Sequence, residues 1–209
     1  MEFLPAGWNV RVLPNFKVYE LSLNKGQYVV LAVDVPRETA FNDSTIGVNT
    51  YRANAIVKGT IQFVSATMPD FERHRGDATL DARLSVKGEY RVQGGEDDSK
   101  FVCIMANDIS AKLYRSANYP LAPGESVTIE ASDLERNLFI VEGSVTIGTG
   151  EHNAFKHLKL TKPQAYTLTN TSTENAFVVY MYEVTKEDVK ALYPEVEPDA
   201  LATVKILQG

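Results

Sequence analysis

The chain contains one strand-turn-strand pattern twice. Residues 55–63 read AIVKGTIQF and residues 139–147 read FIVEGSVTI, with a glycine at Gly59 and at Gly143. In both segments, β-forming residues lead to a charged residue, a glycine and a hydroxyl-bearing or β-branched run that alternates again. A tight hairpin between two short strands needs a positive φ angle, which glycine adopts readily. The pattern therefore predicts the same β-hairpin at two places in the chain.

Two further pairs of segments recur in the same order. Residues 23–31 and 121–129 share Leu-x-x-Gly-x-x-Val-x-aliphatic at an offset of 98. Residues 90–105 and 166–181 share a tyrosine, a Phe-Val pair and a methionine at an offset of 76. Three matches in one order indicate an internal duplication, and the changing offset places longer loops in the first copy.

The recurring blocks predict an all-β fold. Apolar and polar residues alternate within them, and Gly- and Asn-rich turns separate them at short intervals. Many short strands with no long helical stretch are typical of a β-sandwich or jelly roll.

Only the end of the chain changes its period. Thr185 and Asp188 form a variant of the helix capping box, so a short helix is expected to begin there. We therefore expect an N-terminal β domain over residues 1–112, a second over residues 113–184 and a helical tail over residues 185–209. The last part of the tail reads as helical or extended, and we expect it to pack on a sheet edge or on a neighbouring subunit.

Residues 120–184 resemble a cupin domain along nearly their whole length. The usual first cupin motif is Gly-x5-His-x-His-x3-Glu-x6-Gly. At those spacings this chain has Gly124, Glu130, Ser132, Arg136 and Gly143. Both glycines of the motif are present, and its three metal ligands are replaced.

The second cupin motif is also altered. It usually ends in Pro-x-Gly-x2-His-x3-Asn, and here TKPQAYTLTN ends in Asn170 with Tyr166 where the histidine would stand. The first half, residues 17–106, matches less well and has no His-x-His either. The resemblance implies a bicupin, with two tandem cupin-like jelly-roll barrels that lack the metal-ligand motif.

A metal site is not expected. The chain has three histidines, His74, His152 and His157, and none stands at a motif position. We expect them to be surface residues in segments between strands. Arg136, at the position of the motif glutamate, carries a fixed positive charge that repels a divalent ion. The sequence therefore predicts no metal and no cofactor, and it disfavours the metal-dependent cupin reactions.

Four residues of the second half remain candidates for a ligand pocket: Glu130, Ser132, Arg136 and Tyr166. An anionic ligand such as a sugar acid would suit the guanidinium of Arg136. In the alternative interpretation, Glu130 and Arg136 pair across a sheet face and the tyrosines fill the barrel. No catalytic residue is assigned, because no nucleophilic or phosphate-binding motif occurs.

Composition limits the partners. The net charge of −6 and the pI of about 5.2 argue against binding to nucleic acid or to an anionic membrane. No apolar run approaches the ~18 residues of a membrane span, and the start MEFLPAGW does not read as a signal peptide. The single cysteine, Cys103, is expected to be a small buried hydrophobic residue. These features predict a protein without a secretion signal, either cytoplasmic or assembled into a virion.

The sequence favours a non-catalytic structural or interaction protein. It predicts a jelly-roll subunit of a homo-oligomer or larger particle, and our specific hypothesis is a viral (phage) capsid decoration or tail component. Loss of catalytic residues with retention of the glycines and strands is the basis for this interpretation. The alternative is a metal-independent bicupin enzyme or a small-ligand, sugar-type binding protein.

Overall fold

The computed structural model describes residues 8–34, 52–65, 71–75, 88–106, 113–185, 187–188, 191 and 203–208. The strands of the first half are β1 (Trp8–Val12), β2 (Phe16–Leu23), β3 (Tyr28–Asp34), β4 (Arg52–Lys58), β5 (Thr60–Ser65), β6 (Phe71–His74), β7 (Gly88–Gly94) and β8 (Ser99–Ala106). Those of the second half are β9 (Leu113–Leu121), β10 (Ser126–Ile129), β11 (Arg136–Glu142), β12 (Ser144–Ile147), β13 (Gly150–Asn153), β14 (Lys156–Leu160), β15 (Tyr166–Thr169) and β16 (Ala176–Val184). A last strand, β17 (Thr203–Gln208), follows the second half.

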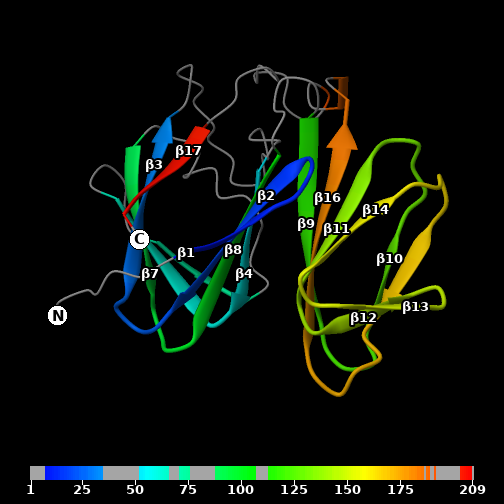
Figure 1. The fold of residues 1–209 in the computed structure, drawn as a ribbon, viewed down its shortest axis with the longest axis horizontal. Coiled ribbons are helices and arrows are strands. Elements are labelled where there is room, and N and C mark those ends of the chain that lie inside the picture. Colours follow the sequence, from blue (N-terminus) through cyan, green and yellow to red (C-terminus); the bar gives the residue numbers. More distant parts are fainter. Residues whose placement is uncertain are drawn as a thin grey trace.

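The strands form four sheets, two in each half. The first half holds a sheet of order β17-β3-β7-β5-β6 and one of order β1-β2-β8-β4. The second half holds a sheet of order β14-β11-β16-β9 and one of order β10-β15-β12-β13. Neighbouring strands pair antiparallel throughout, and each half forms a two-sheet barrel (Figure 1). The predicted all-β fold with two tandem jelly-roll barrels is confirmed.

The same turn precedes β3 in the first barrel and β10 in the second. The amide of Gly26 donates to the carbonyl of Gly94 at 2.9 Å, and the amide of Gly124 donates to the carbonyl of Asn170 at 2.8 Å. The φ angles of the two turn glycines are 79° and 81°. The two donors, Gly26 and Gly124, are separated by the sequence offset of 98. The two acceptors, Gly94 and Asn170, are separated by the offset of 76. The duplication inferred from three short matches thus extends to individual hydrogen bonds.

The tail begins as predicted and ends in a strand. Thr185 and Asp188 form the capping box, with the Thr185 hydroxyl donating to the carboxylate at 2.7 Å and the Asp188 amide donating back at 3.0 Å. Of the residues that follow, 187, 188 and 191 are described as helix. The extended alternative holds for β17, which pairs antiparallel with β3 and so reaches a sheet edge of the first barrel.

The sheet that contains β11 is buried on both faces. Leu138 and Ile140 point into the core of the second barrel, whereas Phe139 and Val141 belong to a core that is shared with the first barrel. All four side chains are at most 1% exposed. Full burial of such a side chain contributes about 1.5–3 kcal/mol, so the contact between the barrels is a continuous part of the hydrophobic core.

Polar and aromatic contacts reinforce the contact between the barrels. The ring of Phe155, which adopts a φ of 70°, lies 5.0 Å from the guanidinium of Arg11 and 5.4 Å from the ammonium of Lys100. At a second place Arg75 of the first half donates to the Glu142 carboxylate at 2.6 Å. Cys103 is buried at 5% exposure, as predicted. Among the described residues, no helix is long and apolar enough to cross a membrane.

Candidate functional site

Arg136, the first predicted pocket residue, is buried inside the second barrel. It is 1% exposed and stands at the start of β11, on the same face as Leu138. Its Nη1 donates to the carbonyl oxygens of Glu130 at 2.7 Å and of Gln164 at 3.0 Å, and its Nη2 donates to the carbonyl of Lys162. The guanidinium therefore ties two loops at one end of the barrel to β11.

This arrangement changes both interpretations of Arg136. Its described partners are main-chain carbonyl oxygens, so the expected pairing with the Glu130 side chain is replaced by a bond to the Glu130 backbone. Because these carbonyls engage the guanidinium, Arg136 is not positioned to receive an anionic ligand from outside. Its Nε has no acceptor within the described residues. Arg136 acts as an internal tether of the barrel mouth.

Tyr166 lies beside Arg136 and completes this tether. The guanidinium carbon of Arg136 lies 5.3 Å from the centre of the Tyr166 ring, within the range of a cation–π contact. Tyr166 packs against the core of the second barrel. It does not line either of the two cavities described below. The alternative in which tyrosine bulk fills the barrel holds for this residue.

A cavity of about 500 Å³ opens between strands β9 and β10 of the second barrel. These strands are the outer strands of the two sheets that form this barrel. Glu130 and Ser132, two of the four predicted pocket residues, line it. Arg136 and Tyr166, the other two, do not line it.

Three tyrosines line the same cavity and form a stacked row, which we call the tyrosine ladder: Tyr119, Tyr180 and Tyr182. The rings of Tyr180 and Tyr182 lie 4.8 Å apart at 19°, and those of Tyr119 and Tyr180 lie 6.3 Å apart at 23°. In the pairing of β9 with β16, Tyr119 lies opposite Val178, two residues before Tyr180. The rings of Tyr119 and Tyr182 therefore flank the ring of Tyr180 on opposite sides. Burial raises the pKa of Tyr180 to about 12, and its phenol stays protonated at neutral pH.

Charged side chains also line the cavity. Arg115 comes from β9, and Glu183 and Asp188 come from the end of β16 and the start of the tail. The Glu183 carboxylate accepts a hydrogen bond from the Glu135 amide at 3.2 Å, and Asp188 is held by Thr185. Together with Glu130, the described residues of the lining hold three carboxylates and one guanidinium, so their formal charge is negative. The alternation of Tyr180 and Tyr182 in FVVYMYEV is the sequence signal for the tyrosine wall, and it belongs to no known motif.

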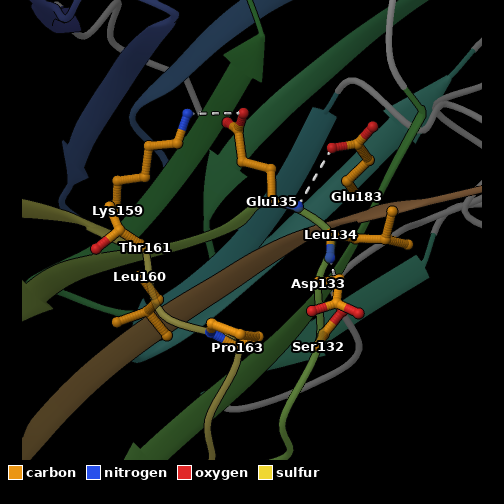
Figure 2. A pocket seen from close by; sticks show the side chains of 9 residues that line it. All are labelled: Ser132, Asp133, Leu134, Glu135, Lys159, Leu160, Thr161, Pro163 and Glu183. Carbon is orange, nitrogen blue, oxygen red and sulfur yellow. Dashed lines mark hydrogen bonds and ion pairs between the residues drawn. The ribbon is translucent and has the colours of Figure 1, made fainter.

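A smaller cavity of about 340 Å³ lies on the other side of the loop that carries Ser132. Figure 2 shows Lys159 and Glu135 pointing toward each other across it, with 2.9 Å between Nζ and Oε2. The Glu135 carboxylate also accepts from the Tyr114 hydroxyl at 3.2 Å and from Asn137 Nδ2 at 3.0 Å. Because its acid is already engaged by three donors, this cavity offers less free chemistry than the tyrosine-lined one.

The histidines do not lie where they were expected. His74, His152 and His157 stand within strands β6, β13 and β14 rather than in loops between strands. His157 is half-buried at the contact between the barrels, with its ring stacked 4.7 Å from that of Phe139. Its Nε2 lies 3.0 Å from Oδ1 of Asn137, and burial lowers its pKa. Alternation of apolar and polar residues across GEHNAFKHLKL is weak, so the sequence carries little signal for these two short strands.

The described residues hold no group of three or more His, Cys, Asp or Glu side chains that could bind a metal ion. Asn137 lies between His157 and Glu135 and contacts both. The donor set of the described part of the chain therefore does not fit a cupin metal centre.

Comparison with known proteins gives likenesses of structure alone. No family model matches the sequence, and no curated protein matches it. The bacterial pirin YhhW from Escherichia coli, in complex with nickel(II), is 9% identical, with coverage of 88% of this chain and 85% of that one and a TM-score of 0.52.

Two more solved structures are similar to this chain. Oxalate decarboxylase from Bacillus subtilis is 9% identical, with coverage of 93% and 80% of the two chains and a TM-score of 0.51. A cupin 2 conserved barrel domain protein from Leptotrichia buccalis is 11% identical over 88% and 91% of the two chains, with a TM-score of 0.41. The chain has the fold of the cupin superfamily, built as two barrels in tandem.

Proposed function

We propose that this protein is a non-catalytic, metal-independent binding protein whose ligand occupies the tyrosine-lined cavity of the second barrel. One observation carries the proposal: an open cavity of about 500 Å³ is lined by aromatic rings, hydroxyls and charges of both signs. Binding sites for small ligands combine apolar and aromatic walls with a few polar groups at volumes of about 300–1,000 Å³. The lining fits that description.

The chemistry of the lining supports binding rather than catalysis. The residue at the metal-motif glutamate position is a buried arginine that is bonded to carbonyl oxygens. The phenol of Tyr180, with its pKa raised to about 12, is a poor acid and a poor base at neutral pH. No imidazole is among the described residues that line the cavity. The decarboxylase and the nickel(II) complex among the solved structures therefore do not supply a reaction for this chain.

A structural role in an assembly is the second candidate, and one observation favours it. Val10 and Val12 on β1 are 45% and 72% exposed, and β1 is the outer strand of its sheet. Exposed apolar residues on a sheet edge favour pairing with another chain. A homo-oligomer or a larger particle, including the virion component hypothesised from the sequence, would use such an edge.

The binding function can be tested with a fragment library and a blocked cavity. Ligand-observed NMR would compare the wild-type chain with the Ala117→Trp variant, in which the indole fills space beside Tyr180 in the cavity. We expect fragments to bind the wild-type chain and not to bind the Ala117→Trp variant. Far-UV circular dichroism checks that the variant is folded.

Two further results decide between the candidates. Binding that persists in Ala117→Trp, or no binding by any fragment, would contradict the cavity as the ligand site. A solution mass that shows a discrete oligomer, which dissociates when Val12 is changed to Lys, would instead support the assembly role. The Val12→Lys variant should still fold, because Val12 is exposed and substitutions at exposed sites change the free energy of unfolding by about 0.5 kcal/mol or less.

A further inference from the structure

The internal duplication makes the two barrels comparable strand by strand. By the sequence offsets, β3 corresponds to β10 and β7 corresponds to β15. The register agrees: Tyr28 pairs with Gln93 in the first barrel, and Ser126 pairs with Thr169 in the second, at matching positions. By the same offset, β2 corresponds to β9. Any strand that one barrel has and the other lacks can therefore be identified.

Two strands of the first barrel have no counterpart among the described residues of the second barrel. The outer edge of β3 is paired with β17, and the outer edge of β2 is paired with β1. In the second barrel, β10 and β9 are the outer strands of their sheets within the described residues. Residues of both outer strands line the tyrosine-lined cavity, together with residues of β16 and of the loop after β10. The cavity is thus open where the first barrel carries added strands.

We infer that the cavity of the second barrel takes an extended peptide of a partner, which adds antiparallel to the outer edge of β10 as β17 adds to β3. The inference deepens the proposed function, on which it rests, by naming the class of ligand. An exposed strand edge offers unpaired amide and carbonyl groups, and addition of a peptide strand satisfies them. Main-chain hydrogen bonds then supply affinity, and pockets for alternate side chains supply selectivity.

The register of β17 indicates which peptide positions would enter the cavity. Ile206 pairs with Leu31, and Leu31 corresponds to Ile129 of β10. Ile129 is buried and belongs to the core of the second barrel, so the strand face that contains it looks inward. A peptide residue opposite Ile129 and its neighbours two residues away would therefore face the tyrosine ladder.

Charge selects the side chain at those inward positions. Glu130, Glu183 and Asp188 outnumber Arg115 in the lining, and the aromatic faces of the ladder attract cations. A lysine or arginine side chain meets both preferences, and a glutamate meets neither. The partner is therefore an extended segment with basic residues at alternate positions.

The experiment uses three capped hexapeptides based on the β17 sequence. The first is TVKILQ itself, the second is TKVKLQ with lysine at the two inward positions, and the third is TEVELQ with glutamate there. Hydrogen exchange of the full chain would be followed with each peptide added. We expect TKVKLQ to slow exchange of the β10 amides most and TEVELQ least. The amides of β13, at the opposite edge of the same sheet, serve as the internal control.

Two controls separate strand addition from charge attraction. A TKVKLQ peptide with N-methyl groups on alternate amides keeps the charge but cannot donate to β10, and it should not protect the strand. Glu130→Lys should weaken binding of TKVKLQ by about tenfold or more and should favour TEVELQ, because a like charge replaces an opposite one. Equal binding of the lysine and glutamate peptides would contradict the side-chain assignment.

The remaining outcomes distinguish this inference from the proposed function. If fragments bind the cavity but no hexapeptide protects β10, the strand addition is wrong and the binding function stands. If neither fragments nor peptides bind, both fail. If the β10 amides are already protected in an oligomer of the chain alone, a second copy occupies the edge and the assignment to a partner peptide is wrong.

Discussion

Arg136 and Tyr166 occupy the positions at which the cupin motifs carry a carboxylate and an imidazole, and the Arg136 guanidinium lies 5.3 Å from the centre of the Tyr166 ring. A cation and an aromatic ring thus contact each other where two metal ligands would converge. The guanidinium also donates hydrogen bonds to carbonyl oxygens of both neighbouring loops. In this barrel a fixed side-chain charge holds the loops at the mouth together.

Replacing Arg136 by Met should destabilise the protein strongly. The change removes bonds from a charged donor to three carbonyl oxygens, and hydrogen bonds to charged groups contribute about 1.5–3 kcal/mol each. We therefore expect urea denaturation to show a loss of about 3 kcal/mol or more in the free energy of unfolding. Arg115→Met, in the same barrel but less buried, should cost about 0.5 kcal/mol or less. A loss below about 1 kcal/mol in Arg136→Met would contradict the tethering role.

Removal of metal should leave the protein unchanged. The described residues offer no group of three metal-binding side chains, and Arg136 places a positive charge at the motif glutamate position. Treatment with EDTA should leave the melting temperature where it is, and elemental analysis of the native protein should find no stoichiometric transition metal. If EDTA removed a bound ion and lowered the melting temperature by several degrees, the conclusion that these residues do not bind a metal would be wrong.

The sequence predicted the parts of the fold that depend on local rules. Gly59 and Gly143 have the expected positive φ angles, 67° and 68°, and the capping box of the tail forms as its two residues require. The predicted hairpins themselves are wrong, because β4 and β5 belong to different sheets, as do β11 and β12. At each glycine the chain passes from one sheet of its barrel to the other. The cavity was only half found. Glu130 was identified through the cupin motif, whereas Tyr180 belongs to no motif and reaches the cavity because β16 lies between β11 and β9. Which strands become sheet edges depends on tertiary pairing, and no single segment encodes it.

Two turn glycines should respond differently to alanine. Gly124 and Gly143 both have positive φ, but an added Cβ at Gly124 would meet nothing within 4 Å, whereas at Gly143 it would lie 2.4 Å from the carbonyl oxygen of Asn175. Gly124→Ala should cost about 1–2 kcal/mol from backbone strain alone. Gly143→Ala should cost a further 1–3 kcal/mol, roughly, because backbone must move. Chemical denaturation of the two variants measures the difference, and equal losses would contradict the close approach at Gly143.

The contact between the barrels should weaken in mild acid through His157. Its ring lies against Phe139 and, edge-on at 5.5 Å, against Phe16 of the first barrel, and its Nε2 lies 3.0 Å from Oδ1 of Asn137. Burial lowers the pKa of His157; the charge of Glu135 opposes this shift and that of Lys159 adds to it. The folded pKa therefore lies below the unfolded value of about 6.5.

The sign of the pH dependence follows from that shift. As the pH falls below about 6.5, the unfolded chain binds a proton that the folded chain does not, so the free energy of unfolding decreases until the folded pKa is reached. Urea midpoints should therefore drop between pH 7.5 and pH 5.5 in the wild-type protein, and drop less in His157→Gln. His152→Gln, which changes an edge-strand histidine away from this contact, should retain the wild-type drop. An unchanged drop in His157→Gln would mean that another group controls the response to acid.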